Sequence, residues 1–226
     1  MGRGIWYLSS TLDIYSGNAP VQLTDLPKLA LHIIPFSSQD TQIVDNFERL
    51  QLIPIIPMFT GGANPAFNAD GYISYADRDG ISKGYVQIFR NGNIEAVSSF
   101  LSEDDPRTLP ITRIEDSVIG ALKNYSNHLR FLRVEPPAFV FITLMNVRGL
   151  SRSNRQGPAR GEGIPIQKDI VPLPNFELKI FGMMENETEL DQLIRDLKPI
   201  FDALSNTVGL AQSPNFNGSG EWIPRR

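Results

Sequence analysis

Two ionisable side chains in the first half of the chain could do acid–base chemistry. His32 lies inside the apolar run KLALHIIPF (28–36), and Glu95 lies in the stretch GYVQIFRNGNIEAV (84–97). A histidine within an apolar strand could act as a general base, because its surroundings shift its pKa across neutrality. More often such a histidine is structural, with its ring nitrogens bonded to backbone or carboxylate oxygens. His32 and Glu95 are therefore weak catalytic candidates, and no catalytic residue is assigned.

Residues that could hold an anion lie in the middle of the same stretch, at Arg90 and Asn91. A guanidinium group can bind a carboxylate or a phosphate through two parallel hydrogen bonds. If the protein is an enzyme, we expect a phosphate-containing or nucleic-acid substrate, with His32 or Glu95 as the base and Arg90 stabilising negative charge. The alternative is an arginine at a sheet edge that pairs with a polar side chain of the neighbouring strand.

A second group of cationic residues lies in RGLSRSNRQGPARGEG (148–163), which has no apolar periodicity and predicts a mobile loop over 150–166. It contains four arginines and a single acid: Arg148, Arg152, Arg155, Arg160 and Glu162. On a chain with a net charge of -4, this local excess of positive charge predicts contacts with phosphate groups. A nucleic acid or a nucleotide is the expected partner, and a solvated surface loop is the alternative.

The composition limits metal and cofactor chemistry. The 226 residues include no Cys and two His, so thiolate sites are excluded and a histidine-built metal centre lacks ligands. The acidic segments SEDD (102–105) and MENETELD (184–191) are more typical of a loop and of a helix start than of a Mg²⁺ site. The chain contains no P-loop motif and no dinucleotide-binding fingerprint. We expect neither a metal nor a cofactor.

These residues must be positioned by the strands and helices that the sequence predicts. Together those elements indicate an α+β (mixed α/β) fold with one mixed sheet and two long amphipathic helices. Apolar runs at 28–36 and 136–149 predict buried strands. The segment around 71–98 predicts an antiparallel meander of three strands. Two prolines interrupt the strand region at 169–181, which predicts either an edge strand or a bulged strand.

Helical periodicity occurs at 109–134 and 187–209, and a shorter helix is expected at 41–52. Thr112 and Glu115 have the spacing of a capping box at the start of the first long helix.

The pair Asn91-Gly92 predicts a two-residue hairpin loop, because both residues tolerate the positive φ of a type I′ turn. Such a loop would place Arg90 opposite Asn93 and would pair Ile88 with Glu95 across the two strands.

Five segments together resemble a known family. In chain order they are LALHIIPF, NADGYISY, GYVQIFRNGNIEAV, FVFITLMNVRG and LKPIFDALSNTVGLAQSPNF, within residues 19–222. They resemble the C-terminal region of bacterial proteins whose N-terminal part is a Schlafen-type, AlbA-like domain associated with DNA or ATP binding. The resemblance implies an AlbA-like partner domain that this chain lacks, so no DNA or ATP contact is carried over to any residue here. We expect residues 1–226 to form a single domain, with 1–18 as the remnant of a linker to an upstream domain.

These observations favour a non-catalytic binding or regulatory module of the bacterial cytoplasm over an enzyme. We expect it to work beside an AlbA-like nucleic-acid- or nucleotide-binding domain, with the arginine-rich loop holding the anion. A further interpretation is a self-associating structural domain, a homodimer that uses the strands at 28–36 and 84–97 as sheet edges. No segment reaches the roughly 20 apolar residues that a membrane helix needs, so no membrane partner is expected.

Overall fold

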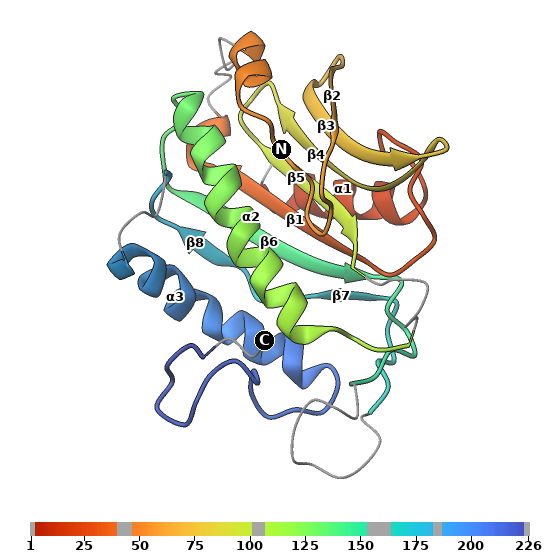
Figure 1. The fold of residues 1–226 in the computed structure, drawn as a ribbon, viewed down its shortest axis with the longest axis vertical. Helices are drawn as coiled ribbons and strands as arrows, with labels where there is room; N and C mark the ends of the chain where they lie inside the picture. The colour runs from red at the N-terminus through yellow and green to blue at the C-terminus, as the bar shows by residue number, and fades with distance from the viewer. Residues whose placement is uncertain (1–2, 40–46, 101–106, 153–163, 183–186, 224–226) are drawn as a thin grey trace.

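The computed structural model describes residues 3–39, 47–100, 107–152, 164–182 and 187–223. In this part the chain forms an eight-stranded sheet and three α-helices (Figure 1). In chain order the elements are α1 (Arg3–Tyr15), β1 (Lys28–Pro35), the 3-10 helices η1 (Phe36–Gln39) and η2 (Phe47–Leu52), β2 (Asn64–Phe67), β3 (Gly71–Arg78), β4 (Ile81–Phe89), β5 (Ile94–Ser99), α2 (Ile111–Phe131), β6 (Ala138–Met145), β7 (Ile170–Pro172), β8 (Phe176–Leu178) and α3 (Glu187–Asn206).

The strand order is β2-β3-β4-β5-β1-β6-β7, and β8 also pairs with β6. The α+β class and the meander are confirmed, with β3, β4 and β5 as the three strands. Every pairing between the named strands is antiparallel, where a mixed sheet was expected. The strands that were expected to offer edges for a homodimer are interior, because β1 lies between β5 and β6, and β4 lies between β3 and β5. The strand region with two prolines does lie at an edge, as β7 and β8.

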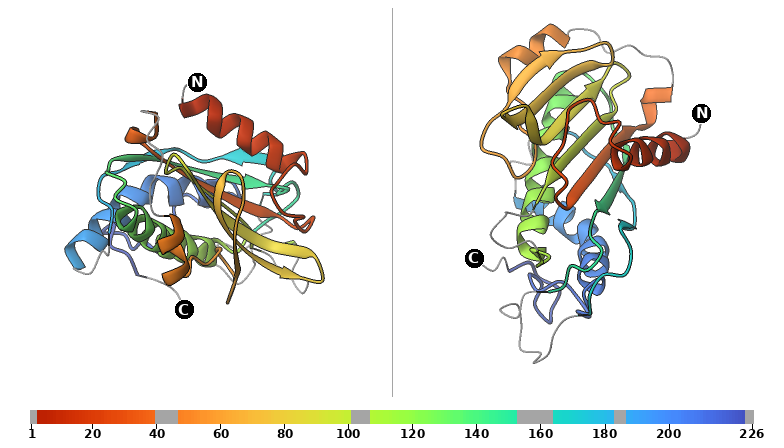
Figure 2. Two further views of the ribbon diagram at one scale, coloured as in Figure 1. Left: turned by 90° about the horizontal axis from the view of Figure 1, so that it is seen from above. Right: turned by 90° about the vertical axis from the view of Figure 1, so that its right-hand side faces the viewer.

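Helices cover both faces of the sheet (Figures 1 and 2). Along β1, Leu29, Leu31 and Ile33 belong to the core that α2 and α3 cover, whereas Ala30 and His32 face α1. All eight residues of β1 are buried, which confirms the predicted buried strand. A strand covered on both faces carries mostly apolar side chains, as β1 does apart from Lys28 and His32.

The larger core lies between the sheet and the pair α2 and α3. The apolar stripe predicted for α2 is buried there, including Val118, Leu122 and Leu129. Burying a side chain of this size contributes roughly 1.5–3 kcal/mol relative to exposure, so this core dominates the stability of the fold.

The capping box predicted at the start of α2 is wrong. The helix begins after Pro110 without a side-chain cap. Glu115 turns inward instead and is completely buried, so it cannot bond to the first backbone N–H groups of the helix.

The loop between β4 and β5 is one residue longer than predicted. The backbone N–H of Gly92 donates to the carbonyl of Phe89, and the N–H of Phe89 donates to the carbonyl of Asn93. The loop is therefore Arg90-Asn91-Gly92, in which Gly92 adopts a φ of 84°. This is the pattern of a type I turn followed by a bulge glycine, so only Gly92 needs a positive φ.

The longer loop shifts the register of the hairpin. Ile88 pairs with Ile94, and Gln87 pairs with Glu95. The predicted pairing of Ile88 with Glu95 is therefore wrong. In the actual register Ile88 and Ile94 both join the core under α2, while Glu95 lies on the face that α1 covers.

Residues 3–15 form α1, where the sequence suggested only a linker remnant. Tyr7, Thr11 and Ile14 are buried at helical spacing against the sheet, whereas Leu8 and Leu12 point outward and are exposed. The helix therefore packs one face on β1 and β6 and covers His32 and Glu95.

Candidate functional site

Three polar side chains lie side by side on the sheet face beneath α1. Glu95 of β5 is paired with Gln87 of β4 on one side and with His32 of β1 on the other. Directly paired residues of antiparallel strands point to the same face, with their Cβ atoms about 5 Å apart. All three are at most 4% exposed. Buried polar groups in a row of this kind require hydrogen-bond partners.

The Glu95 carboxylate is the centre of a hydrogen-bond network. The Tyr85 hydroxyl donates to Oε1 at 2.6 Å, and His32 Nε2 lies 3.1 Å from Oε2. The Ser10 hydroxyl of α1 also donates to Oε2, and its oxygen lies 3.3 Å from His32 Nε2. Partners from two strands and one helix thus fix a single carboxylate, and both of its oxygens are used.

These partners keep Glu95 ionised. Burial alone would raise its pKa, but hydrogen bonds from His32, Ser10 and Tyr85, together with the charge interaction with His32, outweigh it and lower the pKa below its ordinary value. Burial, and then the adjacent Glu95 charge, raise the pKa of Tyr85 well above its ordinary value, so its phenol stays protonated. The phenol therefore remains a donor throughout the physiological pH range.

Aromatic side chains of α1 enclose the imidazole of His32. The rings of Trp6 and Tyr7 meet it edge-on, with centroids at 5.5 Å and 5.3 Å. Tyr7 also stacks on Phe141 of β6 at 4.4 Å. His32 is consequently out of contact with solvent, with no exposed surface.

A cleft of about 300 Å³ opens beside this network, between α1 with its following turn and strands β4 and β5. Glu95, Tyr85 and Gln87 form its buried wall. The wall on the other side comes mainly from α1 and includes Trp6, Ser9 and Asp13. Asp70 at the β2–β3 turn and Phe89 at the end of β4 also line the cleft. His32 does not line the cleft and touches it only through Glu95 and Ser10.

The arrangement of Ser10, His32 and Glu95 differs from a hydrolytic triad. In a triad the serine and the acid bond to opposite nitrogens of the imidazole. Here Ser10 and Glu95 both lie against Nε2, and Nδ1 has no hydrogen-bond partner among the described residues. The serine proton is directed at the carboxylate, so His32 is not placed to activate the hydroxyl. The geometry favours a fixed binding wall over nucleophilic catalysis.

The residues predicted at the hairpin tip do not join this site. Arg90 Nε donates to the carbonyl of Ala69 at 3.1 Å, and the guanidinium lies 5.9 Å from the ring centre of Phe47. Asn91 Oδ1 accepts from the backbone N–H of Asn93 at 3.1 Å. Arg90 and Asn91 thus stabilise the turn. Of the residues named for an enzyme, only Glu95 lines the cleft, whereas His32 and Arg90 do not.

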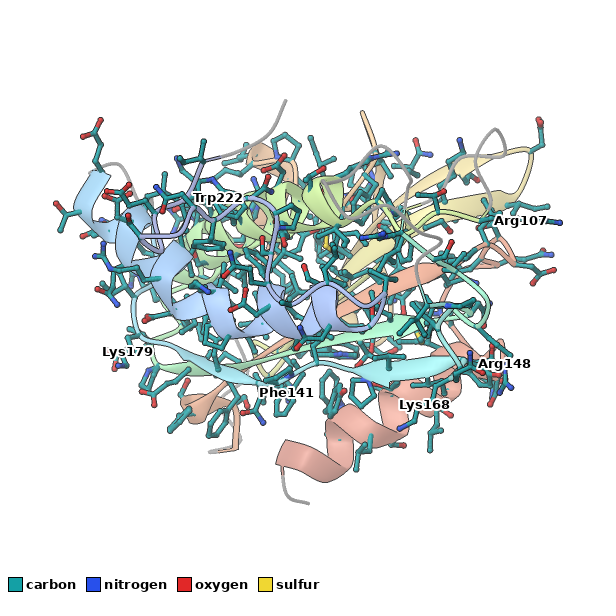
Figure 3. The ribbon with its side chains drawn as sticks, turned by 90° about the horizontal axis from the view of Figure 1, so that it is seen from below. Arg107, Phe141, Arg148, Lys168, Lys179 and Trp222 are labelled. Carbon is teal, nitrogen blue, oxygen red and sulfur yellow. The ribbon has the colours of Figure 1, made fainter. Side chains whose placement is uncertain are left out.

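The arginine-rich segment begins after β6, and none of its described residues, 148–152, lines the cleft. Arg148 is 65% exposed and pairs with Asp169 at 3.1 Å, whereas Arg152 is 91% buried. Arg107 is held beside this segment by a backbone bond from Ser151 to its carbonyl. Figure 3 shows Arg107, Arg148 and Lys168 on the same side of the molecule. Arg155 and Arg160 lie outside the described residues.

A second buried carboxyl lies on the opposite face of the sheet. Glu115 accepts a hydrogen bond from Asn215 Nδ2 at 2.7 Å. Burial is the main cause that raises its pKa to about 8, the charges of Asp116 and Asp202 add to it, and hydrogen bonds from Ser213 and Asn215 oppose it. Glu115 is therefore largely neutral at pH 7 and anchors the C-terminal segment to α2.

The remaining histidine has a structural role. His128 Nδ1 lies 2.8 Å from the carbonyl of Asn124, and its Nε2 lies 3.4 Å from that of Ile53. Burial lowers its pKa, and the two backbone bonds partly offset this.

Sequence reasoning missed the residues that α1 brings to the site, namely Trp6, Ser10 and Asp13. The signal available was the helical spacing of Trp6, Tyr7, Ser10 and Ile14, which the interpretation of 1–18 as a linker passed over. Tyr85 could have been found from strand alternation once the register placed it on the face of Glu95.

No protein family, curated protein or solved structure matches this chain in comparisons with known proteins. In the part of the chain that the structure describes, no three His, Asp or Glu side chains are grouped so that they could hold a metal ion. None of the described helices combines the length and the apolar character needed to cross a membrane.

Proposed function

We propose that the protein is a non-catalytic binding module and that the cleft beside α1 is its site for a small polar ligand. The observation that carries the proposal is the Glu95 carboxylate, which is buried and ionised, is held by three donors from separate elements, and forms part of the wall of a cleft of about 300 Å³. Burying a charge costs free energy, and a buried ionisable group with a shifted pKa at a cleft is a candidate functional residue.

The volume favours a small molecule over a polymer. A cleft of about 300 Å³ is at the lower end of the range for small-molecule sites. The wall also combines aromatic surface with a few fixed polar groups, which is the usual composition of such sites. Because Tyr85, His32 and Ser10 hold Glu95 in place before any ligand arrives, little ordering is needed on binding.

A ligand-detected NMR screen tests this proposal. Saturation-transfer spectra would be recorded with a library of amines, polyols, carboxylates and nucleotides. The cleft is filled in Ser9→Tyr, because Ser9 lines it and is exposed. The matched control is Leu12→Tyr, one turn away on the outer face of α1. We expect at least one compound to bind the wild type and Leu12→Tyr but not Ser9→Tyr. The proposal would be contradicted if the compounds bound Ser9→Tyr as well as the wild type, or if no compound bound at all.

An enzyme remains the second candidate, and the observation in its favour is the convergence of Ser10, His32 and Glu95 within 3.3 Å of one another. The phosphate-directed form of that hypothesis lacks support, since Arg90 does not reach the cleft. Turnover by the wild type that Ser10→Ala abolishes, with any compound found in the screen, would favour the enzyme.

The arginine-rich segment stays a proposed anion-binding surface in its own right. Arg107, Arg148 and Lys168 support it, because they come from three segments and lie on the same side. The partnership with an AlbA-like domain rests on the sequence resemblance.

A further inference from the structure

We propose that the cleft beside α1 takes an organic cation, a small molecule that carries one or more ammonium groups. This inference rests on the proposed binding function and adds the chemical class of the ligand. Three features of the wall carry it: its charge, its aromatic surface and its size.

The charge of the wall is negative. Three of its residues are acids, Asp13, Asp70 and Glu95, and no lysine, arginine or histidine is among the described residues that line it. Even when His32 is protonated and balances Glu95, Asp13 and Asp70 remain. They come from α1 and from the β2–β3 turn, so a cation between them is attracted from two sides. A phosphate or carboxylate would be repelled.

The nearest arginine does not neutralise this charge. Arg90 follows the cleft residue Phe89 in the chain, but its guanidinium is turned toward Phe47, which does not line the cleft. Its Nε donates a hydrogen bond to the Ala69 carbonyl. Arg90 therefore leaves the negative charges of Asp13 and Asp70 available to a cation in the cleft.

Aromatic rings complete the wall. Trp6 and Phe89 meet edge-on at 5.4 Å and both line the cleft, as does Tyr85. An ammonium group is attracted to the face of an aromatic ring, most strongly to that of Trp. Carboxylates and rings at one site favour an alkylammonium ion over a metal ion, which needs a closer set of oxygen or nitrogen ligands than these residues provide.

The experiment is isothermal titration calorimetry with three probes of matched length: putrescine (1,4-diaminobutane), 1,4-butanediol and succinate. They differ in charge and keep a four-carbon chain. We expect saturable binding of putrescine that weakens when the salt concentration rises from about 50 to about 500 mM, because the attraction is screened. The diol and the dicarboxylate should bind at least tenfold more weakly.

Two charge variants locate the effect. Asp13→Asn combined with Asp70→Asn should weaken putrescine binding by about tenfold, since two charge partners are lost. Asp191→Asn combined with Glu177→Gln removes the same net charge from exposed positions on α3 and β8 and should change the affinity less than twofold.

The outcomes separate this inference from the function on which it rests. If butanediol or succinate binds as tightly as putrescine, or if putrescine gives no saturable heat, the cation inference is overturned. The binding function is then tested separately by the Ser9→Tyr comparison in the NMR screen. Equal loss of putrescine binding in both charge variants would show a general charge effect and would also overturn the inference.

Discussion

The pH dependence of stability should carry a large contribution from Glu115. Its pKa is about 8 in the folded protein and near the ordinary 4.5 when the chain is unfolded. Between these values the folded state binds a proton that the unfolded state releases. The contribution of Glu115 to the free energy of unfolding therefore falls as pH rises from about 4.5 to about 8 and changes no further above that. The stabilisation is complete below pH 4.5 and is lost above pH 8.

The magnitude follows from the gap between the two pKa values. Each pKa unit corresponds to about 1.4 kcal/mol, so the loss between pH 5 and pH 9 is on the order of 4 kcal/mol. Glu115→Gln removes the ionisable group but keeps a carbonyl oxygen that can accept the bond from Asn215. The variant should match the wild type within about 1 kcal/mol at pH 5 and exceed it by several kcal/mol at pH 9.

Urea unfolding at pH 5, 7 and 9 measures this difference, provided that the m-value is the same in both proteins. The lowered pKa of His128 also makes stability depend on pH, but it acts equally in both chains and cancels in the comparison. Glu177→Gln, at an exposed position on β8, is the matched control and should show no such trend. A difference between Glu115→Gln and wild type that stays constant from pH 5 to pH 9 would refute the reasoning.

Three further predictions concern the network, the sheet and the basic surface. Tyr85→Phe removes a donor to a buried carboxylate and should lower the free energy of unfolding by about 2 kcal/mol in urea titrations; an unchanged midpoint would contradict the network. Gly84→Ala should lower the free energy of unfolding by more than about 2 kcal/mol, because the new methyl group would lie 2.7 Å from a backbone oxygen. The control Gly120→Ala places its methyl group where no atom lies within 4 Å, so it should stabilise α2 by about 0.5–1 kcal/mol. In thermal melts, a lower melting temperature for Gly84→Ala and a higher one for Gly120→Ala would confirm both expectations. The double variant Arg107→Ala/Arg148→Ala should bind single-stranded DNA more weakly and with less salt dependence in anisotropy titrations at about 50 and 200 mM salt. If the wild type does not bind DNA, the proposed anion-binding surface is contradicted.

Local patterns were sufficient for the strands and helices of the main core. The burial of the apolar run at 28–36 and of the stripe along 109–134 can be predicted from these segments alone, because alternation and helical periodicity are properties of neighbouring residues. The α+β class followed from the order of these elements.

The register of the β4–β5 hairpin was not determined by its turn sequence. Asn91-Gly92 suits a two-residue loop, but a glycine after a type I turn satisfies the three-residue loop equally well. The choice is made by packing, since Ile88 and Ile94 together reach the core in the longer loop.

The site itself could be predicted only in part. His32 and Glu95 were identified singly, but their pairing depends on β1 lying beside β5, a contact between segments 63 residues apart. Ser10 and Asp13 carry no local signal of function. They become site residues only because α1 docks on the sheet, which is a tertiary effect. Glu115 was assigned to a helix cap because the capping-box motif is local and contains no information on the C-terminal segment, whose Asn215 bonds to the buried Glu115.

The central claim is that a ligand binds beside Trp6, and fluorescence tests it most directly. The chain has two tryptophans, Trp6 at the cleft and Trp222 on the other side of the sheet against Phe201 and Phe216. Trp222→Phe leaves Trp6 as the only indole, and Trp6→Phe leaves Trp222. Titrating the strongest ligand from the screen should change the emission of the first variant saturably and leave that of the second unchanged. A response from Trp222 alone, or from neither indole despite binding, would contradict the site.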